Sequence, residues 1–263
     1  MTLPVFYAPA LSDRPHEPLR LGSDEAKHVR SLRLRVGDAV VLADGKGGRW
    51  RAVLTETDRS GTVCRVAEPL PDLVTPPVDL LFGVANRERT LWLVEKAVEL
   101  GVRSLVPYES SRTASVADAA RSPAFRERIT RRAVAAMKQS GGGALPVLEA
   151  PRSFDDVIAR LRDGPGLLLD SGAAATVIDR LRGWDAERPA ALLVGPEGGL
   201  TPDEAEAASE RGFKPAALGS RTLRFETAAV AAVAIAVQAA TGGTGADLPE
   251  EDDGRGTTKG ATR

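Results

Sequence analysis

Four prolines between residues 69 and 77 dictate how this chain can be divided into domains. Proline fixes the backbone φ angle and lacks an amide hydrogen, so neither a helix nor a central strand continues through such a segment. The length of 263 residues also favours two domains, because single hydrophobic cores rarely grow beyond about 250 to 300 residues. We therefore predict a first domain over residues 1–70, a linker over 71–77, a second domain over 78–242 and a disordered tail over 243–263, which is nearly free of apolar residues.

The residues before the prolines show the pattern of short strands. An apolar run at 39–42 precedes a glycine-rich turn at 44–48, and apolar residues alternate with polar ones over 50–56 and 62–67. Short strands joined by glycine turns are typical of a small barrel. One short helix is predicted at 24–30, with Ser23 as its cap.

After the prolines, strands and helices alternate. Continuous apolar runs are what strands buried on both faces require. The order predicts an α/β domain with a mainly parallel sheet. Thr201, Pro202 and Glu204 form a capping box that starts a helix, Ser153 is predicted to cap a helix ending at Arg162, and Thr227 is predicted to cap the last helix. The predicted strands are 78–84, 104–107, 145–149, 166–170, 190–194 and 214–218, and the helices are 88–100, 123–139, 154–162, 202–212 and 228–240.

Composition excludes several classes of protein. One cysteine excludes a disulfide scaffold and a cysteine-built metal site, and two histidines are too few for a histidine-rich one. We therefore predict no metal. No apolar run reaches about 18 residues, and the first residues lack a signal-peptide pattern. We expect no membrane contact and a cytoplasmic protein.

Positive charge is concentrated locally although the net charge is −1. The segment 112–138 holds seven basic and two acidic residues, and a second basic cluster lies at residues 27–35. Such patches bind phosphate even on a neutral protein. A solvated helix face is the alternative interpretation, and the charges alone do not decide between the two.

Two connecting segments carry the strongest functional signal. Gly195-Pro196-Glu197-Gly198-Gly199 lies between a buried strand and a capped helix, and residues 218–228 also join a strand to a helix. Ligands of open α/β sheets bind beyond the carboxyl ends of the strands, where glycines allow close backbone approach. Neither segment is a GxGxxG or P-loop motif, which argues against a nicotinamide dehydrogenase. An ordinary tight turn and a solvated loop remain as alternatives.

The two segments resemble the last two motifs of the SPOUT RNA methyltransferases, and more closely those of the RsmE family of 16S rRNA uridine-N3 methyltransferases. Three further segments are similar to motifs of that family, and the resemblance runs in order over residues 3–241. This chain departs from the family at Gly141-Gly142-Gly143, where an arginine is usual, at Asn86-Arg87 in place of a lysine, and at Lys27 in place of a histidine. The three similar segments are Lys27–Arg33 with Gly37-Asp38, Lys96–Val102 with Pro107 and Ser111-Arg112, and Gln139-Ser140 with Pro146.

The resemblance implies a trefoil-knotted SPOUT methyltransferase domain, a PUA-like β-barrel before it, and a homodimer that forms through the knot region. It implies S-adenosylmethionine as cofactor and methylation of N3 of one uridine in 16S rRNA of the small ribosomal subunit, uridine 1498. The catalytic candidates are Arg221, Arg224 and Glu226. The cofactor candidates are Leu169, Gly195, Glu197, Gly198, Gly199, Leu218, Gly219, Leu223 and Thr227. The RNA candidates are Lys27, His28, Arg30, Arg33, Arg112, Arg128 and Arg132.

Two alternatives stay open beside this prediction. A SPOUT enzyme that methylates ribose 2′-hydroxyls would share the cofactor loops, and an RNA-binding assembly factor would have lost catalysis. Methylation at carbon 5 of a pyrimidine commonly uses a cysteine nucleophile. The single cysteine, Cys64, lies in a predicted barrel strand, where a buried structural role is expected.

Overall fold

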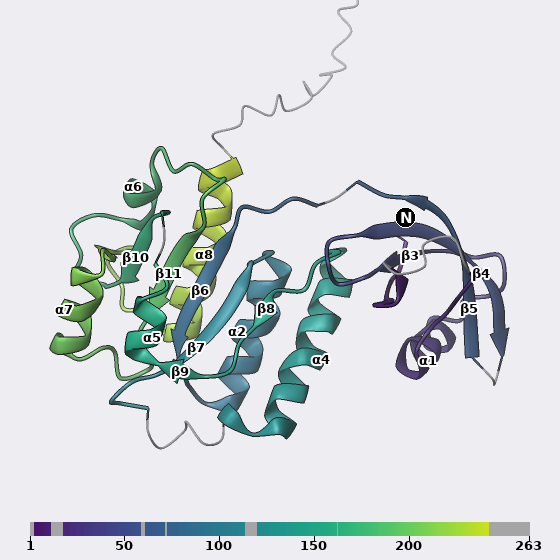
Figure 1. The fold of residues 1–263 in the computed structure, drawn as a ribbon, viewed down its shortest axis with the longest axis horizontal. Coiled ribbons are helices and arrows are strands. Elements are labelled where there is room, and N and C mark those ends of the chain that lie inside the picture. The colour runs from purple at the N-terminus through teal and green to yellow at the C-terminus, as the bar shows by residue number, and fades with distance from the viewer. Residues whose placement is uncertain are drawn as a thin grey trace, which may run out of the picture.

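The structure is a computed structural model that describes residues 3–11, 18–58, 61–71, 73–113, 120–161 and 163–241. Two domains lie side by side and are joined by the proline-rich segment (Figure 1). Strand β5 (Gly61–Pro69) ends at the first of the four prolines, and β6 (Val78–Gly83) begins directly after the last. The predicted tail lies outside the described residues.

The first domain is a five-stranded sheet with one helix. Its strand order is β1-β3-β4-β5-β2, and β1 pairs with β3 in parallel while the other pairs are antiparallel. Asp44 Oδ1 accepts the amides of Lys46 and Gly48 and so closes the predicted turn. The prediction for the helix cap is wrong: Gly22 is the N-cap and Ser23 already lies in the helix, because the chain stays extended up to Gly22. The other elements are β1 (Val5–Tyr7), β2 (Leu19–Arg20), α1 (Ser23–Ser31), β3 (Ala39–Ala43) and β4 (Arg49–Asp58).

The second domain is built on a parallel sheet, as predicted. Its strand order is β12-β10-β11-β6-β7-β8, and β9 also pairs with β7. Every strand pair in this sheet is parallel in the described part of the chain. The strands are β7 (Ser104–Glu109), β8 (Val147–Leu148), β9 (Arg152–Ser153), β10 (Gly166–Leu169), β11 (Ala190–Val194) and β12 (Lys214–Ala216).

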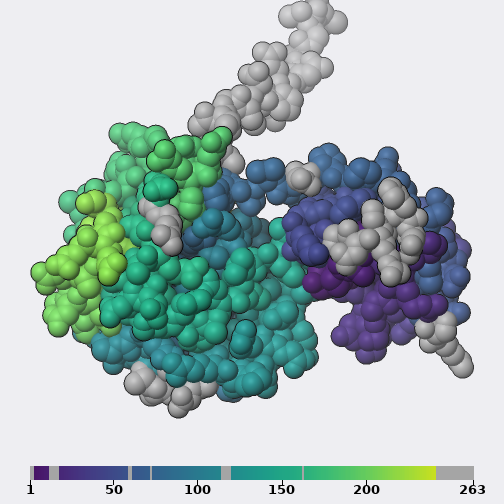
Figure 2. All heavy atoms as spheres, in the orientation of Figure 1, coloured from purple at the N-terminus to yellow at the C-terminus, as the bar shows by residue number. Residues whose placement is uncertain are grey.

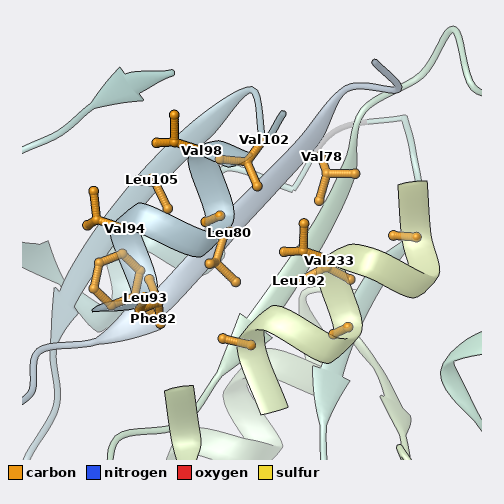
Figure 3. Close-up of a cluster of buried hydrophobic side chains, with 14 of the residues drawn as sticks. Val78, Leu80, Phe82, Leu93, Val94, Val98, Val102, Leu105, Leu192 and Val233 are labelled. Carbon is orange, nitrogen blue, oxygen red and sulfur yellow. The ribbon is translucent and has the colours of Figure 1, made fainter. Parts of the chain in front are cut away.

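Helices cover both faces of this sheet, which explains the continuous apolar runs. Successive side chains of a strand point to opposite faces, so Leu80 and Leu192 belong to one core while Leu81 and Leu193 belong to the other. Figure 3 shows the first core, where β6 and β11 pack against α2 and α8. Helices α2 (Arg87–Glu99), α4 (Pro123–Ser140), α6 (Val177–Leu181) and α8 (Phe225–Thr241) lie on this side, and α5 (Phe154–Ile158) and α7 (Pro202–Glu210) lie on the other.

The first residues of the helices show which local sequence signals predict the structure correctly. The capping box of α7 is confirmed, because Thr201 and Glu204 bind each other's backbone amides. Ser153 caps α5 as predicted, but the helix ends at Ile158, four residues before the predicted end. Helix α8 begins at Phe225, so Thr227 is not its cap and Glu226 lies in its first turn. The short α6, with a capping box of its own, was not predicted.

The two domains share a packed interface between the barrel and α4. Val5 and Val41 of the barrel join the same apolar core as α4 and α2. Lys138 Nζ lies 2.7 Å from Glu25 Oε1 across the interface, and both side chains are largely buried. Gly143 accepts the amide of Gly47 through its carbonyl, and a Cβ at Gly143 would lie 2.4 Å from the carbonyl oxygen of Gly47. The contact zone is visible where the teal and purple surfaces meet (Figure 2).

Candidate functional site

The glycine loop, residues 195–199, follows β11 and is held in place from three sides. The Tyr108 hydroxyl donates to the carbonyl of Val194 at 2.8 Å, just before the loop. A Cβ at Gly83 would lie 2.7 Å from the ring nitrogen of Pro196, so glycine is required there for the loop to approach β6. Arg112 donates through Nη1 to the carbonyl of Gly198. The loop is therefore a fixed structure at the carboxyl edge of the sheet, as its position after β11 predicted.

The second loop, residues 217–224, follows β12 at the same edge of the parallel sheet. Ala217 is fixed by backbone hydrogen bonds to Ala175 and Val177. Gly219 has a φ of +133°, which side-chain-bearing residues rarely adopt, and no atom lies within 4 Å of where its Cβ would be. Leu169 and Leu218 are half-buried against the main core. Open backbone flanked by half-buried leucines fits the purine and ribose of a nucleoside-containing cofactor.

A cavity of about 450 Å³ opens where the start of α8 faces α2 and α4. Among the predicted residues it brings together Arg224, Glu226, Thr227 and Arg132. Arg221 does not line it. The remaining lining residues are Glu88, Arg89, Leu91, Trp92 and Glu95, all on α2.

Glu226 is the buried acidic group of this cavity. Its side chain is 11% exposed, and its Oε2 is buried with no hydrogen-bond partner in the described part of the structure. A buried acceptor without a donor is costly, since such a group loses its hydration without compensation. The unpartnered oxygen is therefore a candidate acceptor for a donor that reaches it when the cavity is occupied.

Arg89 links the glycine loop to the first turn of α8 electrostatically and was missed in the sequence. Its Nη1 lies 2.9 Å from Glu197 Oε1 in the glycine loop, and its Nε lies 3.9 Å from Glu226 Oε1. The three residues come from separate segments, and no local motif marks Arg89. A basic residue in the first turn of a helix, next to a strand end, was the available signal.

Two of the predicted RNA candidates of the second domain, Arg128 and Arg132, lie in a groove between α2 and α4. This groove shares Leu91, Glu95 and Arg132 with the cavity and continues past Arg128. Both arginines are paired with carboxylates of α2, Arg132 with Glu95 and Arg128 with Glu88. Hydrogen bonds from Lys96 and Arg132 hold the pKa of Glu95 below its ordinary value. The groove is therefore less positive than the sequence of α4 alone indicates.

The other RNA candidates are scattered. Arg112 binds the glycine loop and lies at the sheet edge. Lys27 forms an exposed ion pair with Asp24, Arg30 and Arg33 are exposed, and the His28 ring packs against Phe6 with its Nδ1 buried. Their roles stay predictions.

Within the described ranges, no group of three or more histidine, cysteine or acidic residues is arranged to hold a metal ion. Among the same residues, no helix is both long and apolar enough to cross a bilayer. Burial raises the pKa of the Cys64 thiol to about 12, so this side chain is a protonated core residue of the barrel.

Comparison with known proteins gives a consistent result. A family model described as an RNA methyltransferase domain matches residues 74–237, and one described as an RNA methyltransferase PUA domain matches residues 21–66. The ribosomal RNA small subunit methyltransferase E of Mycobacterium bovis is 29% identical over 243 residues, covering 89% of this chain and 90% of the relative. The protein of the same name from Synechocystis is 30% identical over 216 residues, covering 78% of this chain and 67% of the relative.

A solved structure agrees with the sequence relatives. The crystal structure of a ribosomal RNA small subunit methyltransferase E from Neisseria gonorrhoeae bound to S-adenosyl methionine matches with a TM-score of 0.77 and 26% identity. The match covers 89% of this chain and 96% of that chain. The first domain is therefore PUA-like and the second is a SPOUT methyltransferase domain, as the resemblance implied. This chain belongs to the RsmE family of RNA methyltransferases.

Proposed function

We propose that the protein methylates N3 of one uridine in 16S rRNA, uridine 1498, with S-adenosylmethionine as cofactor. The observation that carries the proposal is the buried, unpartnered Oε2 of Glu226 in a cavity that also contains Arg224. Uracil presents an N3–H donor between two carbonyl acceptors. A carboxylate acceptor beside an arginine donor is complementary to that edge.

The cofactor is assigned to the two loops on the geometry of Gly195, Gly199 and Gly219. The open, positive-φ backbone at Gly219 and the half-buried Leu169 and Leu218 fit an adenosine group, and the loops end beside the cavity. When bound, S-adenosylmethionine supplies a methyl group on a sulfonium, which needs no metal for transfer. Leu223, 37% exposed, adds apolar surface to the same loop.

The residues of the cavity account for removal of the N3 proton and for stabilisation of the negative charge on the uracil. Glu226 Oε2 accepts the N3 proton, so the carboxylate becomes a carboxylic acid as the nitrogen gains its methyl group. The negative charge that develops on the uracil oxygens is stabilised by Arg224, whose guanidinium is permanently charged. Arg132, from α4, lines the opposite side of the cavity and is placed to hold a phosphate or a uracil oxygen.

We place the RNA along the groove between α2 and α4 and across the PUA-like domain. The groove runs directly into the cavity, and Arg128 and Arg132 line it. The target base must leave its stack to enter the cavity, where the 43% exposed Trp92 offers an aromatic surface. The small ribosomal subunit as partner, and a cytoplasmic location, follow from this substrate.

We also propose the homodimer and the trefoil knot that the resemblance implies. Helix α8 is apolar along its length, yet Ala231, Ala234 and Ile235 are only half-buried, which leaves a face that a second copy would cover. Ala231→Glu should then yield a monomer by light scattering. The knot is supported by the insertion of β11 between β6 and β10.

The alternatives make different demands on the cavity. A ribose 2′-hydroxyl would also satisfy Glu226 Oε2, but it does not explain why the arginine donor Arg224 lies beside it. A non-catalytic assembly factor would have no need of an unpartnered buried carboxylate, which destabilises the fold. The N3 proposal accounts for both residues.

Primer extension on 16S rRNA tests the function in the cell. An N3-methyl group blocks reverse transcription, so a strain lacking the gene should lose one stop. The wild-type gene should restore it, whereas Glu226→Gln, with nearly the same shape, should not. Restoration by Glu226→Gln, or an unchanged stop in the deletion strain, would contradict the proposal.

A further inference from the structure

Arg89 occupies a position between two carboxylates, one from the glycine loop and one from the first turn of α8. Its Nη1 contacts Glu197 Oε1 at 2.9 Å, and its Nε lies 3.9 Å from Glu226 Oε1. Glu197 belongs to the loop proposed for the cofactor, and Glu226 is the acceptor proposed for the N3 proton. One guanidinium therefore touches both halves of the reaction site.

The contact with Glu226 involves only one of its two carboxylate oxygens. Arg89 faces Oε1, whereas Oε2 of the same carboxylate is the buried atom without a partner. Glu226 is 11% exposed while Glu197 is 46% exposed, so solvent screens the charge interaction with Glu226 less. We propose that Arg89 is a positioning residue that holds Glu226 as an oriented carboxylate and fixes the cofactor loop to it through Glu197.

Most other charged side chains around Glu226 have partners of their own, so we assign the orientation of Glu226 to Arg89. Arg132 is paired with Glu95, and Glu88 is paired with Arg128. On α6, which also packs against α8, Asp179 closes the capping box and Arg180 donates to the carbonyl of Pro215. On β6, beneath α8, Asp79 is paired with Arg103. Arg224 is exposed in the same cavity, where the proposed function assigns it to the uracil oxygens.

The inference rests on the proposed function and predicts a loss of turnover and not of RNA binding. Without the guanidinium, Glu226 loses the cation that faces its Oε1, and Glu197 loses its ion pair. The proposed proton acceptor is then held less firmly, so kcat should fall while KM for the RNA stays unchanged. S-adenosylmethionine should bind more weakly, because the glycine loop loses its ion pair with α2.

Arg89→Gln and Arg89→Lys test this, with Arg87→Gln as the matched control. Arg87 lies in the same first turn of α2 and stacks on Phe125, away from the cavity. In Arg89→Gln we expect kcat to fall about tenfold with KM for the RNA unchanged, and S-adenosylmethionine affinity measured by calorimetry to weaken. Arg89→Lys should restore most of both losses, because it keeps the charge.

Four outcomes separate this inference from the proposed function. A kcat in Arg89→Gln equal to that of Arg87→Gln would overturn the positioning role, as would a loss confined to KM for the RNA. If Glu226→Gln is inactive at the same time, the proposed function stands without the role of Arg89. If Glu226→Gln keeps wild-type kcat, the assignment of the proton acceptor itself fails.

Discussion

Arg221 and Arg224 are close in sequence but differ in their relation to the cavity. Arg224 lines it and Arg221 does not, although both are exposed. Arg224→Ala should therefore lower kcat about a hundredfold, which corresponds to about 3 kcal/mol for a lost electrostatic donor. Arg221→Ala is the matched control, and it should change KM for the RNA at most. Steady-state kinetics on small subunits measures both, and equal losses of kcat would contradict the distinction.

Cys64 is expected to be unreactive in the folded protein. Burial raises the pKa of its thiol from an ordinary 9.0 to about 12, and methylation at carbon 5 of a pyrimidine requires a thiolate that adds to carbon 6. Cys64→Ala should keep wild-type kcat, and a thiol reagent at pH 8 should label the cysteine only after unfolding. The unfolded chain loses this proton above about pH 9 while the folded chain keeps it, so the free energy of unfolding should fall as pH rises from about 9 to 12. Rapid labelling of the folded protein would contradict the assignment.

At the scale of elements, the loops around the sheet edge determine cofactor affinity. Gly219 and Gly183 both have positive φ angles, and neither has an atom within 4 Å of its missing Cβ. Alanine at either site should cost about 1 kcal/mol of stability through backbone strain. Only Gly219→Ala should weaken S-adenosylmethionine binding, because only Gly219 lies in the proposed cofactor loop. Calorimetry on both variants checks this, and equal affinities would remove residue 219 from the cofactor site.

The elements that could be predicted are those with local signals. The apolar runs at 190–194 and the capping box at Thr201 depend on neighbouring residues only, and both are confirmed. Strands β1 and β2 were missed, because three and two residues become strands only by pairing with β3 and β5 far along the chain. Helix α8 begins earlier than its apparent cap, because Phe225 is buried in the tertiary core.

The candidate site also has parts that could be predicted and parts that could not. The positions of the two loops could be predicted, because each follows a strand of a parallel sheet. The cavity could not be predicted, since it forms where α2, α4 and α8 meet. Arg89 reaches two carboxylates that lie more than a hundred residues away in the chain.

At the scale of the whole molecule, the domain interface fixes the PUA-like domain beside α4. Gly143, at the point where the sequence departs from its family, packs its backbone against Gly47, where a side chain would not fit. The ion pair between Lys138 and Glu25 lies next to this contact, and Glu25 Oε2 is buried without a partner among the described residues. This arrangement holds the barrel against α4, which also lines the groove.

Removing Lys138 should therefore destabilise the protein. Lys138→Met leaves a largely buried carboxylate unpaired and should cost up to about 3 kcal/mol, lowering the thermal midpoint by several degrees. Adding Glu25→Gln should recover part of the loss. Lys27→Met, which removes an exposed ion pair on the same helix as Glu25, should leave the midpoint unchanged. Equal midpoints for Lys138→Met and Lys27→Met would show that the interface pair does not stabilise the domain arrangement.

Mass spectrometry of nucleosides tests the central claim most directly. Small subunits from a strain lacking the gene are incubated with the purified protein and S-adenosylmethionine carrying a labelled methyl group, and their RNA is digested to nucleosides. The account predicts label in N3-methyluridine with the wild-type protein and none with Glu226→Gln. Label in a 2′-O-methylated nucleoside or in 5-methyluridine, or equal labelling by Glu226→Gln, would contradict it.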